Sequence, residues 1–316
     1  MSENDSLQRA ESLWFSPEIV VLRANTRVFR VFAAILKAQS SVFADMFTFP
    51  QPPSADLEMM DGFPVVKLYD DPDEVEVFLK AIFDSSFFMP PPAETHFENA
   101  IGILHLSHKY DVPYLRRRAL EHLSTIYPTR LEGYDNRADN TESTQVDFHR
   151  RIITIQVAAE VGSLWILPLA YHDLCKREIL DIITSVEWQA LGEKERNACL
   201  AGHSARTSYF PKLYRFLTVH KADEDECDDW SECNRLRLEF SHDVVQWVNT
   251  TWPLDNWNNQ DWTAMEETGI CETCIADSKA VYAASRQTFW DQLPQMFGLP
   301  GWEGLEEMRR VALSVS

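Results

Sequence analysis

Four of the six cysteines form two close pairs in the last third of the chain. Cys227 and Cys233 are separated by five residues, and Cys271 and Cys274 by two. A Cys-x2-Cys pair lets two sulfur atoms bind one ion, and four thiolates complete the tetrahedral shell of a structural zinc. The sequence therefore predicts that Cys227, Cys233, Cys271 and Cys274 bind one structural Zn²⁺.

Two alternatives compete with this interpretation. Cysteine is a common buried residue, so the four thiols could belong to a hydrophobic core without any metal. The five-residue gap of the first pair is also unusual for half of a zinc site, and His220 or His242 could replace a cysteine ligand. The remaining cysteines, Cys175 and Cys199, lie singly in helical sequence and are expected in the core.

A four-cysteine shell leaves no position for water, so it predicts structure rather than catalysis. The sequence also lacks a Gly-rich phosphate loop, a Gly-x-Ser-x-Gly motif and a His-Glu-x-x-His motif. We therefore expect no enzymatic activity, and a metal-dependent enzyme is the least favoured interpretation.

The composition excludes several classes of protein. The chain has 316 residues, of which 45% are hydrophobic, enough for two globular domains. Its formal net charge of −20 opposes nucleic-acid binding, which needs a basic surface. The sequence has no long apolar run typical of a membrane span, and its polar N-terminus does not resemble a signal peptide. We expect an intracellular protein, in cytoplasm or nucleus, that binds neither nucleic acid nor membrane.

The region that must position the four cysteines, residues 221–316, shows little apolar periodicity in 221–233 and 253–275. Such segments bury little surface and gain most from a metal that clips them together. We expect zinc to tie an acidic loop to the start of the final helix, which carries Phe289. The tryptophans at 247, 252, 257 and 262 fit neither helical nor strand spacing, so we interpret them as separate anchors of a loop-rich lobe.

Two segments precede this lobe. Residues 146–220 predict a helical region, in which Ile152 and Ile155 share one face and Gly162 ends a helix. Residues 129–145 are polar and predict a linker or insertion.

The first half, residues 16–128, predicts a small sheet with helices. Two runs rich in strand-forming residues, 19–22 and 27–31, flank Asn25, which tolerates the left-handed backbone of a tight turn. A third strand is predicted at 65–69.

Several helix starts can be predicted in this half. Ser40 or Ser41 is expected to cap a short helix, and the Pro-rich stretch 48–64 predicts a loop. Asp71 with Pro directly after it, and Thr95 with Glu three residues later, both indicate helix N-termini. Ahead of the first strand, residues 1–15 predict a short helix whose apolar face carries Leu7, Leu13 and Trp14 and could serve dimerisation.

The order strand, turn, strand, helix, helix, followed later by helices around 104–115, resembles a BTB/POZ domain over residues 16–128. The positions that carry the resemblance are Phe29, Leu36, Ser40, Phe43, Phe47 and the segment Leu-His-Leu-Ser-His-Lys-Tyr-Asp-Val-Pro-Tyr-Leu at 104–115. The resemblance implies an α+β fold and a module that binds a protein partner or a second copy of itself.

Three positions depart from the family's pattern. Glu18 stands where an Asp is usual, Phe32 where a His is frequent, and residues 83–85 where Tyr-Thr-Gly is common. The first departure weakens the expectation of a strand-swapped dimer, and the last weakens that of cullin binding.

Outside this domain, the amino-acid sequences of residues 165–177 and 289–300 resemble the helical region of a large group of fungal BTB proteins. We therefore expect a protein-protein interaction module. The alternatives are a substrate adaptor of a cullin-type ubiquitin ligase and, less favoured, the metal-dependent enzyme.

Overall fold

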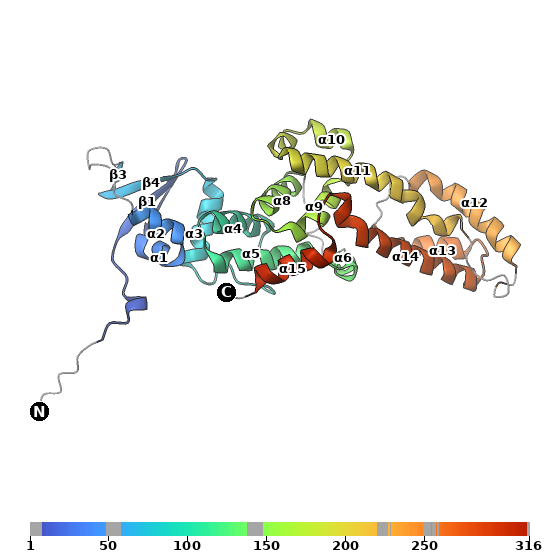
Figure 1. Cartoon of the computed structure of the whole chain (residues 1–316), viewed down its shortest axis with the longest axis horizontal. Helices are drawn as coiled ribbons and strands as arrows, with labels where there is room; N and C mark the ends of the chain where they lie inside the picture. Colours follow the sequence, from blue (N-terminus) through green and yellow to red (C-terminus); the bar gives the residue numbers. More distant parts are fainter. Residues whose placement is uncertain are drawn as a thin grey trace, which may run out of the picture. The chain divides into compact units, whose positions relative to one another are not determined.

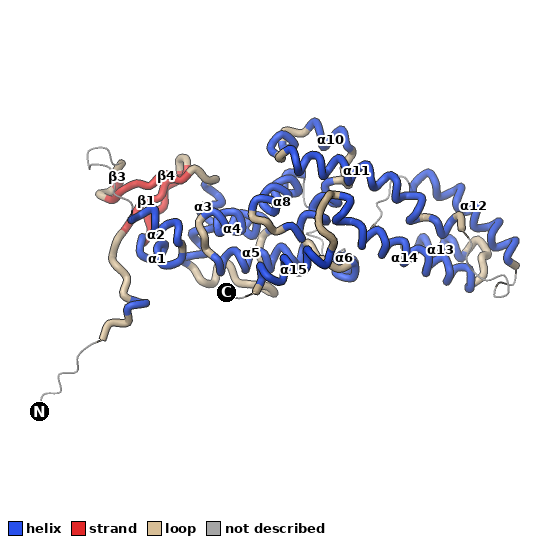
Figure 2. The backbone as a smooth tube through the Cα atoms, viewed as in Figure 1, coloured by secondary structure: helices blue, strands red, loops and turns tan. Residues whose placement is uncertain are grey.

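The computed structural model describes residues 8–48, 58–137, 148–219, 227, 229–248, 254, 257 and 259–314. The chain divides into two compact units, an N-terminal unit of residues 1–125 and a C-terminal unit of residues 126–316. All the strands that the structure describes belong to the N-terminal unit (Figure 2). The protein thus mixes α and β structure and is mostly helical, and the predicted regions 146–220 and 221–316 lie in one unit.

The sheet of the N-terminal unit has the strand order β2-β1-β4-β3 (Figure 1). β1 (Ile19–Ala24) and β2 (Arg27–Phe32) pair antiparallel, as predicted, around Asn25, whose φ is 52°. β4 (Phe63–Leu68) returns parallel to β1, with Val21 opposite Val65. The two-residue strand β3 (Met59–Met60) extends the sheet antiparallel to β4, so part of the segment predicted as a loop is strand.

The helices of this unit are α1 (Ala33–Gln39), α2 (Ser41–Thr48), α3 (Pro72–Phe83), α4 (Phe97–Lys109) and α5 (Pro113–Ile126). Ser40 caps α2 as expected, since its Oγ accepts a hydrogen bond of 3.0 Å from the Phe43 N–H. The carboxylate of Asp71 caps α3 by accepting from two backbone N–H groups. The predicted capping box before α4 is wrong, because the residue before the helix is His96 and no side chain caps it.

The core of this unit is apolar. Leu22 of β1, Leu36 of α1 and Phe43 of α2 are fully buried, and the ring of Phe43 stacks on that of Tyr110 with centroids 4.6 Å apart. The predicted N-terminal helix is wrong in its described part: residues 8–15 contain only a single 3₁₀ turn, η1 (Glu11–Leu13), and Leu13 and Trp14 are exposed. Leu7 lies outside the described residues.

The C-terminal unit is helical throughout its described part. Its elements are α6 (Leu131–Arg137), α8 (Phe148–Glu160), η3 (Leu164–Ile166), α9 (Leu167–Leu174), α10 (Ile179–Thr184), η4 (Glu187–Ala190), α11 (Glu193–Leu213), η5 (Arg215–Leu217), α12 (Trp230–Val248), α13 (Asn259–Glu266), α14 (Glu272–Met296) and α15 (Trp302–Leu313). None of the helices that the structure describes is long and apolar enough to cross a membrane.

Residues 129–145 are predicted to be a linker or an insertion, and their described part contains a helix in place of a linker. α6 occupies residues 131–137, its Tyr134 is buried, and Asp135 forms a two-pronged ion pair with the buried Arg286 of α14. The polar composition of this segment does not indicate a linker, because the polar side chains of α6 bind partners that lie far away in the chain.

The expectation of a loop-rich lobe is also wrong, since α12 and α13 cover much of it. In α12 the inward positions are Cys233, Leu236, Arg237 and Phe240, at the spacing i, i+3, i+4 and i+7 of one helical face. The sequence shows no clear apolar pattern for this helix, because one member of its inward face is a charged arginine and another is a cysteine.

Candidate metal centre

The four cysteines come from two helix starts. Cys271 is the residue that precedes α14, and Cys274 lies in the first turn of that helix. Cys233 lies in the first turn of α12, whose start is fixed by Asp229: its carboxylate accepts a hydrogen bond of 3.0 Å from the Glu232 N–H. Cys227 lies shortly before α12. Figure 1 shows α12, α13 and α14 together at one end of the C-terminal unit.

The four sulfur atoms lie within 4.8 Å of one another. The Sγ of Cys227 is 3.7 Å from that of Cys271 and 3.5 Å from that of Cys274. A tetrahedral ion with sulfur at roughly 2.3 Å separates its ligands by about 3.8 Å. The group is therefore of the right size for one mononuclear ion, with the widest separation up to about 1 Å larger than ideal. An iron–sulfur cluster would hold its cysteines farther apart, because its own atoms lie between them.

Backbone groups already point at the sulfur atoms. The Cys271 N–H donates to Cys233 Sγ at 3.4 Å. Burial by itself raises the pKa of Cys271, but hydrogen bonds from the backbone and side chain of Cys274 and from neighbouring thiols outweigh it and lower that pKa. Burial raises the pKa of Cys233 and of Cys274. Crowded thiols of this kind resist joint ionisation unless a cation is bound.

The surroundings of the four cysteines are largely apolar. Cys227, Cys233 and Cys274 are buried and Cys271 is half-buried, and they belong to one hydrophobic cluster with Trp257, Trp262, Met265 and Ile270. In that cluster the backbone N–H of Trp257 donates to the Tyr282 hydroxyl at 2.9 Å. The described tryptophans of the regular five-residue series are thus parts of a single core, whereas Trp247 and Trp252 lie outside the residues whose side chains the structure describes.

The structure brings together all four predicted ligands, and they could hold a metal ion. His242 is exposed and not part of the group, and His220 lies outside the described residues. Four protein ligands leave no open position, so the arrangement can hold chain segments together but offers no site for a metal-bound water.

Sequence reasoning missed one residue of this centre, Arg237. Its side chain is fully buried, and its Nη2 donates to the Cys274 carbonyl oxygen at 3.5 Å. The signal was present, because Arg237 follows Cys233 by four residues and therefore lies on the same helical face.

Two other pairs of reactive side chains lie among the described residues. Cys175 and Cys199 are buried as expected, with their sulfur atoms 3.8 Å apart. His105 contacts the Glu74 carboxylate at 2.8 Å, as a half-buried pair in the N-terminal unit.

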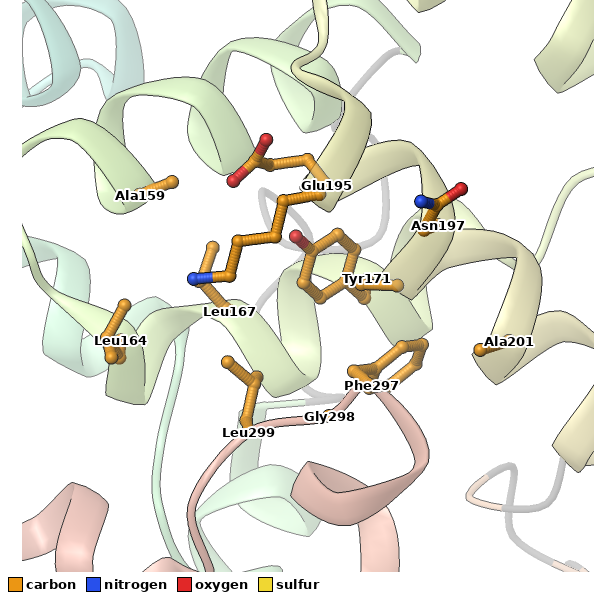
Figure 3. A pocket seen from close by; sticks show the side chains of 12 residues that line it. Ala159, Leu164, Leu167, Tyr171, Glu195, Asn197, Ala201, Phe297, Gly298 and Leu299 are labelled. Carbon is orange, nitrogen blue, oxygen red and sulfur yellow. The ribbon is translucent and has the colours of Figure 1, made fainter.

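A cavity of about 330 Å³ lies between α8, α9, α11 and the segment after α14. Figure 3 shows Tyr171 and Phe297 on its wall, with Glu195 and Asn197 on the α11 side. The rings of Tyr171 and Phe297 stack with centroids 5.0 Å apart. Lys194 also lines the cavity, and the remaining lining side chains are aliphatic.

Comparison of the chain with models of protein families, with curated proteins and with solved structures found no match. The resemblance to BTB/POZ domains therefore stays a prediction.

Proposed function

We propose that this chain is a protein-interaction protein whose N-terminal unit is a module of the BTB/POZ type. The observation that supports it is the connectivity of that unit: a hairpin, two short helices, a strand that returns parallel to β1, and then α3, α4 and α5. This is the order that the sequence resemblance implies.

Exposed apolar side chains in the same unit support the proposal. Leu13, Trp14 and Phe15 precede the sheet, Phe32 lies on the edge strand β2, and Met59 lies on the opposite edge strand β3. Exposed apolar groups and unpaired strand edges favour association with another protein chain. A second copy of this chain or a separate protein partner would cover them.

The test is the mass of the full chain in solution by light scattering at micromolar concentration, with proximity labelling in cells. We expect either a dimer or the capture of a protein partner, and Phe32→Asp should abolish this association. Leu180→Asp, at an exposed apolar position of the C-terminal unit, is the control and should not affect it. A strict monomer that captures no protein would contradict the proposal. Copurification of a cullin would narrow the function to a ubiquitin-ligase adaptor.

We further propose that the four cysteines bind one structural Zn²⁺. A tetrahedral set of four thiolates favours zinc or iron, and a redox-inert zinc suits a site with no solvent position. Elemental analysis of protein purified without a metal-affinity tag should give about one zinc per chain. Iron in its place, or no metal at all, would contradict this assignment.

A further inference from the structure

The most unusual side chain of the C-terminal unit is Arg237 on α12. It is among the largest fully buried side chains, with an exposed fraction of 0%. Its Nε and Nη1 atoms are buried without a hydrogen-bond partner among the described residues, and the contact of Nη2 with the Cys274 carbonyl is long. A guanidinium stays charged at any physiological pH. Burying it therefore requires a compensating negative charge.

The neighbours of Arg237 show where that charge can arise. Burial lowers the pKa of the Arg237 guanidinium. Negative charge on Cys274, Asp277, Cys233 or Cys227 would act in the opposite direction and stabilise the charged form. Three of these four are the predicted metal ligands. With neutral thiols, only the half-buried Asp277 would remain to compensate the guanidinium, whereas Zn²⁺ bound by four thiolates carries a net charge of −2.

We propose that Arg237 is the buried counter-ion of the metal centre, an inference that rests on the proposed zinc site. Its positive charge stabilises the dianionic four-thiolate complex in a largely apolar surrounding, and the complex in turn compensates the buried guanidinium. Arg237 is thus a positioning residue for the metal: it binds the backbone of one ligand, Cys274, and lies one helical turn from another, Cys233.

The same geometry explains how α12 and α14 are held together. α12 supplies a ligand and the counter-ion, while the start of α14 supplies two ligands and the carbonyl that accepts from Arg237. Loss of the metal would leave a charge in the core between these segments.

Asp277, half-buried one turn further along α14, is the competing counter-ion. If it were the partner of Arg237, the burial of the arginine would need no metal. Asp277→Asn and Arg237→Met therefore separate the two explanations.

The experiment measures zinc affinity of the full chain by competition with a chromophoric chelator, and the absorption spectrum of the Co²⁺-substituted protein. Arg237→Met should weaken zinc binding by about 10–100-fold, the usual effect of removing an outer partner of a metal ligand. Arg237→Lys, which keeps the charge, should restore most of the affinity. Arg286→Met is the matched control, because it removes a buried arginine of the same unit that pairs with Asp135 and not with the cysteines. It should leave zinc affinity within about twofold.

Each outcome decides between explanations. Equal zinc affinity in the wild type and Arg237→Met, or a loss with Asp277→Asn as large as that with Arg237→Met, would overturn the proposal. A lysine variant no better than the methionine variant would reduce Arg237 to a packing residue. If Arg237→Met does not fold, Arg237→Lys still tests the proposal, because the lysine variant should show the Co²⁺ spectrum of four thiolates at tetrahedral geometry. A wild-type chain that binds no zinc would instead reject the proposed zinc site on which this inference depends.

Discussion

The two units stabilise their cores in different ways. In the N-terminal unit the core is formed by apolar side chains such as Leu22 and Phe43, and one acidic side chain, that of Asp70, is buried beside Lys109 and Tyr110. The C-terminal unit buries Asp173, Arg237 and Arg286. Each of these three charges is compensated by a residue that is distant in the sequence or by the proposed metal centre.

This difference shows what each unit depends on. Apolar burial is non-directional and tolerates small shifts. A buried charge is stabilised only while its partner stays in place, and it is strongly destabilising once the partner is lost. We therefore expect the C-terminal unit to respond sharply to single changes and to metal removal, and the N-terminal unit to respond weakly. The following tests, from the largest expected effect to the smallest, can break or sharpen this comparison.

Removal of the metal should have the largest effect. Cys271→Ser, or a strong chelator, should lower the free energy of unfolding of the C-terminal unit by more than about 3 kcal/mol, because binding free energy at a structural zinc is folding free energy. Calorimetry should then show two separate transitions, with that of the N-terminal unit unchanged. Cys199→Ser, at a buried cysteine outside the group, should retain the zinc. A parallel shift of both transitions would contradict the comparison.

The buried ion pair of Asp173 comes next. Its carboxylate accepts two hydrogen bonds from Arg137, at 3.1 and 3.2 Å, and both side chains are nearly buried. Asp173→Asn should cost about 3 kcal/mol in urea unfolding, because it leaves a buried guanidinium without its counter-charge. Asp181→Asn, at an exposed position of α10, should change stability by less than about 0.5 kcal/mol. Equal effects of the two variants would reject the role of the pair.

The same pair predicts a pH dependence. Burial alone raises the pKa of Asp173, but a hydrogen bond from His172 and the charge of Arg137 outweigh it, so the folded-state pKa lies below its ordinary value. The stabilising contribution is therefore complete above the unfolded-state pKa of about 3.9 and is lost as the pH falls below it. Denaturation between pH 7 and pH 3 should show the difference between wild type and Asp173→Asn shrinking only at the acid end. A difference that shrinks between pH 7 and pH 5 would contradict the direction of this shift.

A smaller effect on stability is expected from the close packing of Gly202 against Phe297, whose ring lines the cavity of Figure 3. A Cβ on Gly202 of α11 would lie 1.9 Å from Cε1 of Phe297, so Gly202→Ala forces this ring to move. We expect a loss of about 1–2 kcal/mol, the overpacking cost less the better helix propensity of alanine. Gly304→Ala on α15 is the control, because its Cβ would meet Pro300 at an ordinary 3.5 Å and should be neutral or stabilising. The urea midpoint of Gly202→Ala should therefore fall, and that of Gly304→Ala should stay unchanged or rise.

The smallest effect is expected at a helix cap of the N-terminal unit. Asp71→Ala removes the acceptor for two N–H groups of α3 and should cost about 1 kcal/mol, in the N-terminal transition alone. Thr95→Ala tests the capping box that the sequence suggested and the structure lacks, and it should change stability by less than about 0.5 kcal/mol. A loss at Thr95 as large as that at Asp71 would restore the sequence-based interpretation.

The sequence by itself determined the features that depend on neighbours in the chain. The hairpin at Asn25, the caps at Ser40 and Asp71, and the close pair Cys271 and Cys274 are local arrangements, so residue type and spacing were enough to predict them. The sequence also indicated that both cysteine pairs belong to one centre, because four sulfur ligands complete a tetrahedral shell.

Only the tertiary structure decided which polar residues are buried. Asp135, in the segment predicted as a linker or insertion, and Arg237, in the lobe predicted to be rich in loops, are as polar in sequence as any surface residue. Their burial depends on partners that the chain brings close from far away, Arg286 in one case and the start of α14 in the other. A charge enters a protein core only where the folded chain supplies its counter-charge. Local spacing can place Arg237 on the helical face of Cys233, but it does not identify the group that compensates its charge.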